Sequence, residues 1–279
     1  MKYLLLLFFL SLQCYGQLSS NFHSSKQPIF ELGLGAININ IPYYPGAKNN
    51  QNLFIPFIWP IYRGKTFRFD QEGNRAKLTD NQLFELGMSF WVTPPIKAED
   101  NPIRSDLRDL EYVGEIGPRL ILRIISNSEW QKLNINFSLR AAYEISAHDL
   151  RSKFIGLSGG PSISYWIYLN KSRSASLFTT ASWFLGDQSY NNFFYGTKGS
   201  KQLENYQGAS GEISRRVFSR IAFNLTNRVQ VFLGGFYADL KKNTNLNSPL
   251  IESKTNSGFA FGFLWNFYQS EKKVNIYGG

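Results

Sequence analysis

The segment from Gly258 to Phe267 constrains the fold of this 279-residue chain more than any other stretch. Successive side chains of a β-strand point to opposite faces of the sheet. One face of this strand would be wholly aromatic, with Phe259, Phe261, Phe263, Trp265 and Phe267. The other face would carry mostly small side chains. Such a strand fits the core of a soluble sandwich, or a barrel in lipid that turns its aromatic face outward.

The same alternation recurs along most of the chain, most clearly from Leu133 to Ile145. We expect about twelve strands, at 28–41, 53–62, 66–71, 74–79, 83–92, 110–125, 133–145, 154–168, 175–185, 212–223, 229–239 and 258–267. The sequence therefore favours an all-β protein in which antiparallel strands follow one another along the chain.

The connections between these strands alternate mainly between short and long. Short turns are expected at 63–65, 79–81, 126–130, 170–173 and 225–228, and long loops at 42–52, 93–108, 187–207 and 241–256. Short periplasmic turns and long external loops are typical of a membrane barrel. The short connections at 72–73 and 147–152 depart from this pattern. We predict a transmembrane antiparallel β-barrel of about twelve strands, of the bacterial outer-membrane type.

Two of the expected strands contain irregular features. In the first, Glu31, Gly33 and Gly35 would face inward, and the alternation then slips at Ile37, which suggests a bulge near Gly35. In the second, Pro56 and Pro60 share a face opposite a run of large apolar residues. Proline cannot donate a hydrogen bond to a neighbouring strand, so these two positions are awkward inside a sheet.

The N-terminus has the pattern of a secretory signal. Lys2 precedes an apolar run from Leu4 to Leu12, and Gly16 offers a small residue for cleavage. We expect a signal peptide at 1–16, a periplasmic segment at 17–27, the barrel at 28–267 and a C-terminal tail at 268–279. Cleavage would remove Cys14, the only cysteine, and with it any disulfide or thiolate chemistry. A lipoprotein is the alternative, but Gln13 stands where a lipobox needs a small residue.

The composition narrows the expected partners. The formal net charge is +10, yet no basic run with interleaved aromatic residues and no recognition-helix period is present, so nucleic acid is not expected. Positive charge on an exported protein fits outer-membrane lipid headgroups, lipopolysaccharide or cell-wall polymer. The mean hydropathy of −0.25 is compatible with a barrel, because half of each strand faces a polar lumen.

Charged residues fall mostly on the faces opposite the apolar ones. The alternation predicts a charge network inside the barrel, made by Arg68, Glu85, Glu115, Arg119, Arg123, Arg140, Glu144, Glu212, Arg216 and Arg220, with Glu31 beside it. One interpretation is a mutually neutralising network that plugs the lumen, since buried charges need partners. The other is a selective pore or a pocket for an anionic solute. Arg215 falls on the outward face, which suggests a membrane interface or a register shift nearby.

The sequence offers little support for an enzyme. Gly156-Leu157-Ser158-Gly159-Gly160 matches the G-x-S-x-G pattern, but it lies within an expected strand and not at a strand-to-helix turn. The two histidines, His23 and His148, have no metal-ligand neighbours in the sequence. We predict no catalytic residue, no metal and no cofactor. A lipid hydrolase using Ser158 and His148 is the least favoured alternative.

Four stretches resemble a known family. The first three are Tyr43-Tyr44-Pro45-Gly46-Ala47, the proline-bearing strand from Phe54 to Tyr62, and the segment from Tyr190 through Phe194 to Gly196. The fourth runs from Leu240 through Asn247 and Ser248-Pro249-Leu250. In this order they are similar to motifs of the MipA/OmpV family. Asn247 replaces the family's acidic residue. Gly262, Trp265 and Phe267 resemble the last strand of bacterial outer-membrane barrels, the signal for the barrel-assembly machinery, although a tail follows Phe267.

The resemblance implies an outer-membrane barrel that is not an enzyme. One branch of that family is described as an MltA-interacting scaffold that holds a murein hydrolase near a peptidoglycan synthase. The expected function is therefore structural or scaffolding, at the cell envelope. A small porin-like solute channel with a charged lumen is the alternative.

Overall fold

The computed structural model describes residues 26–64, 67–70, 73–76, 79–80, 83–125, 130–146 and 151–275. Several predictions from the sequence lie outside these ranges. They are the signal peptide and its cleavage site, Cys14, most of the 17–27 segment, both histidines and the last four residues of the tail.

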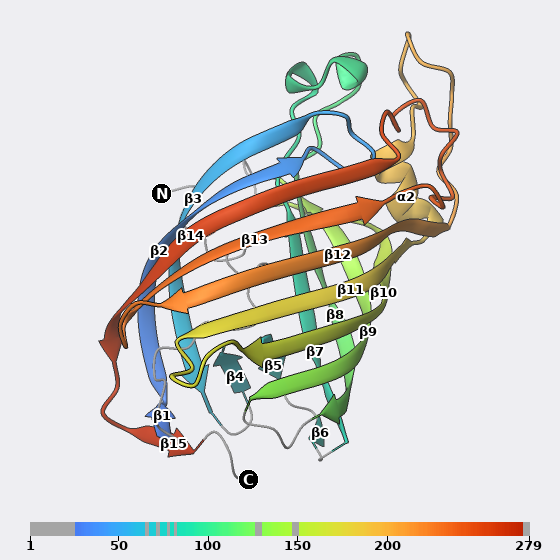
Figure 1. The fold of residues 1–279 in the computed structure, drawn as a ribbon. Coiled ribbons are helices and arrows are strands. Elements are labelled where there is room, and N and C mark those ends of the chain that lie inside the picture. The colour runs from blue at the N-terminus through green and yellow to red at the C-terminus, as the bar shows by residue number, and fades with distance from the viewer. Residues whose placement is uncertain are drawn as a thin grey trace.

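The described residues form one large antiparallel sheet and one small one (Figure 1). The large sheet has thirteen strands within these ranges, in the order β5-β4-β3-β2-β14-β13-β12-β11-β10-β9-β8-β7-β6. Their bounds are β2 Phe30–Pro42, β3 Asn50–Arg63, β4 Phe67–Asp70, β5 Gly73–Ala76, β6 Thr79–Asp80, β7 Phe84–Thr93, β8 Tyr112–Ile125, β9 Gln131–Ile145, β10 Ser152–Tyr168, β11 Ala175–Gly186, β12 Gly211–Asn224, β13 Val229–Asp239 and β14 Thr255–Gln269. The predicted strands are confirmed, and within this large sheet the sequence analysis missed the two-residue β6.

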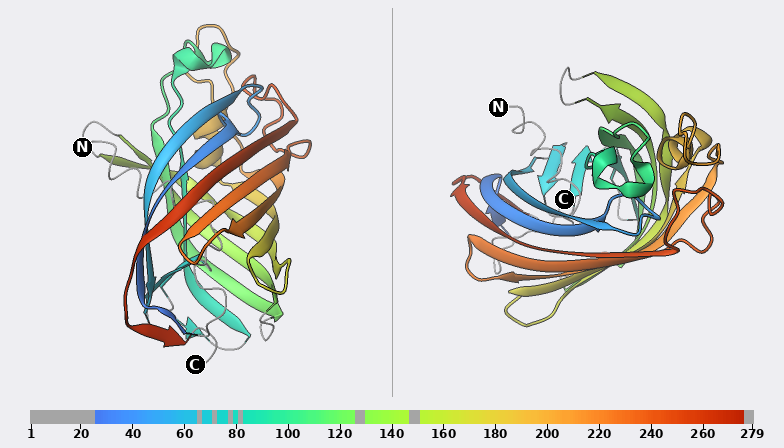
Figure 2. Two further views of the ribbon diagram at one scale, coloured as in Figure 1. Left: turned by 60° about the vertical axis from the view of Figure 1, so that its left-hand side comes forward. Right: turned by 90° about the horizontal axis from the view of Figure 1, so that it is seen from above.

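The large sheet curls strongly upon itself, as seen from above in Figure 2. Nearly every strand pairs with its neighbour in the sequence, and the pair β14–β2 joins the last long strand to the first. The curl brings β5 into contact with β7, so the two ends of the sheet approach each other. The expected class, an all-β antiparallel sheet of the outer-membrane barrel type, is confirmed.

The two ends of the curled sheet differ in structure. The long connections gather at one end, with the helix α2 Gln188–Tyr195 and the short helices η1 Ala98–Asp100 and η2 Pro102–Arg104 (Figure 1). At the other end, β1 Lys26–Pro28 pairs with β15 Lys273–Asn275. The alternation pattern did not predict this second sheet, which ties the start of the described chain to the segment after the barrel.

The outer face of the sheet is apolar, as predicted. The five alternate aromatic side chains of β14 from Phe259 to Phe267 are each 43–53% exposed, whereas Leu264 on the opposite face is 1% exposed. Outward side chains on other strands follow the same rule, including Leu34, Ile116, Leu139, Ile163, Val217 and Leu233. This continuous apolar surface is what the hydrocarbon of a membrane would contact. Among the described residues, no helix is both long and apolar enough to cross a membrane.

Part of the inner face is also apolar, which corrects one prediction. We name this part the apolar wall, formed by Ile37, Ile55, Phe57, Trp59, Ile61, Ala222, Phe232, Ala260 and Leu264. The predicted bulge near Gly35 is wrong, because β2 pairs with β3 without a shift and Ile37 simply faces inward. The register shift lies on β14 instead, between Asn266 and Tyr268.

The two prolines of β3 lie on the face opposite the apolar wall. Pro56 and Pro60 share the outward-facing parity with Phe54 and Ile58, opposite the inward residues of the apolar wall. The register with β2 runs unbroken past both of them, while the described part of β4 pairs only with Tyr62 and Arg63. Prolines are tolerated where a strand edge needs no donor, so β3 accommodates them at this edge of the sheet.

A charge placed on the outer face should reveal its contact with lipid. We expect Leu233→Arg, on the outward face of β13, to lower the free energy of unfolding by about 2–4 kcal/mol. Leu225→Arg, in the short turn between β12 and β13, is the matched control and should cost about 0–1 kcal/mol. The measurement is equilibrium unfolding by denaturant in phospholipid vesicles. Equal costs at the two positions would contradict a lipid-facing β13.

Candidate functional site

The carboxylate of Glu115, on the inner face of β8, accepts hydrogen bonds from three side chains. The Arg140 Nε atom donates to its Oε2 atom at 2.9 Å, and the Tyr190 hydroxyl donates to its Oε1 atom at 2.8 Å. The Ser158 hydroxyl also donates to Oε2. Glu115 is 2% exposed, so its charge is held by three donors from three different elements. We call these four residues the Glu115 cluster.

The helix α2 brings Tyr190 into this cluster, and the sequence analysis missed it by assigning 187–207 to a loop. Asp187 caps the helix by accepting a hydrogen bond from the backbone N–H of Tyr190 at 2.7 Å. Tyr190, Asn191, Phe194 and Tyr195 are the buried residues of the helix. The cap signal was present at Asp187, but eight residues in an aromatic loop have no clear helical period.

A glycine of β10 lets α2 lie close against the sheet. Gly156 has φ +132°, which favours glycine, and a Cβ atom there would lie 2.3 Å from Asp187 Oδ1 and 2.4 Å from Tyr190 N. It stands at the register shift between β9 and β10, where Phe154 and Gly156 pair on either side of Ile155. The backbone at Gly156 thus makes room for the first turn of the helix.

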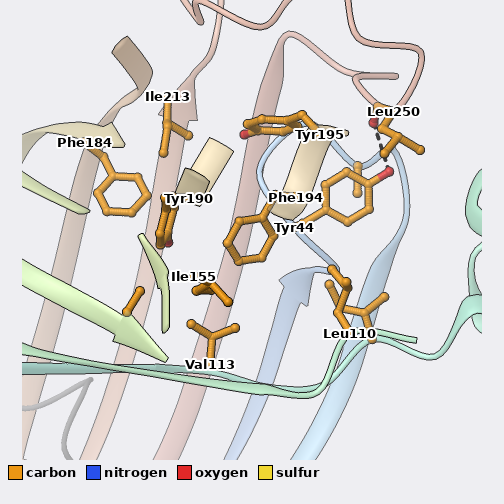
Figure 3. Close-up of a cluster of buried hydrophobic side chains, with 13 residues drawn as sticks. Tyr44, Leu110, Val113, Ile155, Phe184, Tyr190, Phe194, Tyr195, Ile213 and Leu250 are labelled. Carbon is orange, nitrogen blue, oxygen red and sulfur yellow. Dashed lines mark hydrogen bonds between the residues drawn. The ribbon is translucent and has the colours of Figure 1, made fainter. Parts of the chain in front are cut away.

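The long loops interlock above the cluster to form what we call the cap. Its apolar centre contains Tyr44, Leu110, Tyr190, Phe194, Tyr195, Ile213 and Leu250 (Figure 3). Ile96 belongs to the same cluster. The Tyr44 hydroxyl donates to the Leu250 carbonyl at 2.9 Å, the dashed line in Figure 3. Residues more than 200 positions apart therefore pack together at the long-loop end.

The family-like motifs meet in this cap. The Gly46 N–H donates to Asn256 Oδ1 at 2.7 Å, so the 43–47 motif is tied to the start of β14. The Ser248 hydroxyl donates to the Tyr195 carbonyl at 2.7 Å, which joins the fourth motif to α2. The Nη1 atom of Arg104 donates to the Phe194 carbonyl at 3.1 Å. Pro45, Gly196 and Pro249 lie in the same connected segments. Segments that the sequence could only place in separate loops thus form one structure.

The structure brings together some of the predicted lumen charges. Arg123 pairs with Glu85, and Arg140 pairs with Glu115. Glu31 pairs with Arg63 at 2.6 Å, a residue that the sequence analysis had assigned to a turn. Arg119 and Arg220 also belong to the inner face, opposite Ser138 and Gly234 respectively. Arg68 lies on β4, and its side chain is outside the described part.

Two predicted members of the network lie elsewhere. Glu212 pairs with Arg215 at 2.9 Å, and Arg215 is directed outward beside the ring of Trp183. The cause is a register shift at Phe184 and Leu185, which also turns Ile213 inward. Arg215 itself shares the outward parity of Val217, and the register shift that the sequence analysis suggested near it lies at Ile213. Glu144 pairs with Arg108 from the loop that carries η1 and η2, so it belongs to the mouth of the barrel.

Ser158 does not have the surroundings of a catalytic nucleophile. It lies inside β10, where its hydroxyl donates to Glu115, and no strand-to-helix turn is present at this position. Among the described residues, no group of three or more metal-ligating side chains comes together. The G-x-S-x-G pattern around Ser158 instead supplies small side chains where the sheet and α2 are close.

Burial of cap tyrosines should make the cap sensitive to alkali. Burial raises the pKa of Tyr44, against the opposing effect of the Arg104 charge, and burial also raises the pKa of Tyr195. Because the folded-state pKa is raised, the contribution to stability is complete below the ordinary tyrosine pKa near 10 and is lost as the pH rises further. Tyrosinate absorbance during a pH titration should show late-ionising groups, with one fewer in Tyr44→Phe. Ionisation of every tyrosine together would contradict a buried cap.

The comparisons with known proteins identify the family. The profile of one family, described as MltA-interacting protein MipA, matches residues 32–267, which is most of the chain. The chain belongs to the MipA family. The suspected resemblance is therefore confirmed, and the matched range runs from β2 to the aromatic end of β14. A search of curated proteins found no match.

Solved structures of other outer-membrane proteins are similar to this MipA-family chain at low identity. An outer-membrane channel from Pseudomonas putida F1 has 10% identity and a TM-score of 0.46, covering 85% of this chain and 96% of that one. The translocator domain of the autotransporter NalP from Neisseria meningitidis has 9% identity and a TM-score of 0.40, covering 88% and 90%.

Proposed function

We propose that this MipA-family barrel is a non-enzymatic anchor in the bacterial outer membrane that holds a murein hydrolase, and through it a peptidoglycan synthase, near the cell wall. The observation that carries the proposal is the interlocked cap over an ion-paired lumen. A protein built to pass solutes would need an open path through the long-loop end. Here apolar packing and hydrogen bonds join distant loops across that end, which supports a closed lumen.

The end opposite the cap would face the periplasm if the long loops are external. The β1–β15 sheet lies at that end, beside the short turns (Figure 1). This small sheet pairs the segment after the barrel with the segment before it. That end of the barrel therefore carries regular structure in addition to the short turns, and a partner could bind to it. The family's description as an MltA-interacting protein supports a murein hydrolase as the partner.

Capture of partners is the direct test. The purified barrel, immobilised in detergent, should enrich a murein hydrolase and a peptidoglycan synthase from solubilised envelopes. An unrelated outer-membrane barrel of similar size is the control. Absence of both enzymes from the captured fraction would reject the anchoring role.

Conductance in a planar bilayer separates the anchor from a channel. We expect the wild-type protein to show no stable ohmic steps, because the cap closes one end of the lumen. Steps that disappear when Arg119 and Arg123 are both changed to Gln would assign a solute channel instead, since both arginines lie on the inner face of β8.

A further inference from the structure

Among the described residues, Arg216 on the inner face has no ion-pair partner of its own. Three arginines of the described inner face have glutamate partners, in the pairs Arg63–Glu31, Arg123–Glu85 and Arg140–Glu115. Arg216 lies on the same face, close enough to Glu115 and Arg140 to interact with both electrostatically. The Glu115 carboxylate is already engaged by three donors. A second arginine near one carboxylate leaves a local excess of positive charge in a partly desolvated place.

The surroundings of Arg216 hold its guanidinium group in place without neutralising it. Its Nε atom donates to Ser214 Oγ at 2.7 Å, and its guanidinium carbon lies 3.9 Å from the centroid of the Phe184 ring. Among the described residues, the two terminal nitrogens have no hydrogen-bond or ion-pair partner. A fixed arginine with free terminal donors is suited to bind a carboxylate or a phosphate.

A row of polar side chains extends from Arg216 across the sheet. In the strand register Arg216 lies opposite Ser182, Ser182 opposite Ser162, and Ser162 opposite Asn136. We call these four residues the polar row. All four point inward and are nevertheless half-buried, so they border space inside the lumen and not a packed core. Three strand spacings of about 4.8 Å give a row of roughly 14 Å, long enough for one or two sugar rings.

Aromatic side chains lie beside the polar row. Phe218 follows Arg216 by two residues and shares its face, and its ring centroid is 6.3 Å from that of Phe178 on β11. Both rings are half-buried. A sugar ring presents hydroxyl groups at its rim and C–H groups on its faces, so hydroxyl and amide groups next to aromatic rings match its chemistry.

We propose that the polar row and the two phenylalanines form a binding site for a small anion that carries hydroxyl groups, namely a carboxylated or phosphorylated sugar. The anionic group binds the terminal nitrogens of Arg216, and the hydroxyl groups bind Ser182, Ser162 and Asn136. Because the cap covers the long-loop end, the ligand enters from the end opposite α2. This inference goes beyond the anchoring role and does not depend on it.

Calorimetric titration of the full mature barrel in detergent tests the site. The probes are glucuronate and glucose 6-phosphate, with glucose as the uncharged control. We expect both anions to bind and glucose to bind at least tenfold more weakly. Whichever anion binds more tightly identifies the carboxylate or the phosphate as the preferred group.

The neighbouring arginines of β12 provide a matched pair of variants. Arg216→Gln should weaken binding of the anions by tenfold or more, since a charge-assisted contact is lost. Arg215→Gln removes the same charge one residue away on the outward face and should change the affinity less than twofold. If Arg216→Gln does not fold, Ser182→Ala serves instead and should weaken binding about threefold to tenfold.

Three results would overturn the proposal. They are no binding of either anion to the wild type at millimolar concentration, equal binding of glucose and glucuronate, and equal losses in Arg215→Gln and Arg216→Gln. The capture of murein enzymes is unaffected by all three, so failure of this site and failure of the anchoring role are distinguishable.

Discussion

Replacing Glu115 with Leu should destabilise the barrel by about 3–5 kcal/mol, the largest loss that we expect from one side chain. The variant leaves the Arg140 guanidinium in a largely buried place without its carboxylate, and removes the acceptor of the Ser158 and Tyr190 hydroxyls. Each of these buried donors would then lack a hydrogen-bond acceptor, and the free energy needed to remove it from water would no longer be offset. Unfolding by denaturant in vesicles, followed by tryptophan fluorescence, measures the effect.

Two further variants separate charge burial from general damage at this position. The double variant Glu115→Leu with Arg140→Met should recover part of the loss, because it removes the unpaired charge as well as its partner. Glu99→Gln breaks the exposed pair with Lys97 and should cost less than about 1 kcal/mol. A double variant no more stable than Glu115→Leu would show that the ion pair is not the source of the loss.

Replacing Gly156 with Ala should displace α2 and, if the cap closes the lumen as proposed, open its long-loop end. The added Cβ atom would lie 2.4 Å from the backbone N of Tyr190, and φ +132° is itself unfavourable for alanine. The backbone N of Tyr190 cannot move without moving the first turn of α2, and that turn connects the cap to the Glu115 cluster. We expect stable conductance steps in a planar bilayer, where the wild type gives none.

Gly235→Ala is the matched control for this variant. Its added Cβ atom would meet a single neighbouring atom, the Gly258 carbonyl oxygen, at 3.3 Å. β13 lies three strands from β10, the strand on which α2 mainly packs. It should remain non-conducting. If Gly156→Ala also stays closed while folding normally, α2 is not the element that closes the lumen.

The prediction of strands succeeded because lipid and lumen impose opposite preferences on alternate residues. Along β14 the pattern left no ambiguity, since the outward residues from Phe259 to Phe267 are all aromatic. It was misleading along β2, where Ile37 is apolar and yet faces inward. The rule assumes a polar lumen, and the apolar wall violates it on one side of the barrel. A single sequence cannot show that one wall of a lumen is apolar.

The charge network was predicted in outline and corrected in its pairing. Glu85, Glu115 and Arg140 lie where alternation placed them, because no register shift intervenes in their strands before those residues. Glu212 was placed wrongly because a bulge inverts the parity beyond it, and bulges have no dependable signal in a single sequence. Arg63, at the end of a strand, and Arg108, in a loop, were missed as the partners of Glu31 and Glu144. No sequence pattern relates such positions to a distant glutamate.

The sequence by itself determined the antiparallel barrel, its apolar outer surface, its long and short ends and its family, since these follow from local alternation and local motifs. Tertiary structure alone decided that separate motif loops interlock in one cap and that α2 brings the Tyr190 hydroxyl to Glu115. It also decided that Arg216 interacts electrostatically with a carboxylate that already accepts three hydrogen bonds. The physical reason is that alternation assigns a side chain to a face, while contacts between faces and loops depend on register shifts and closure over more than 200 residues.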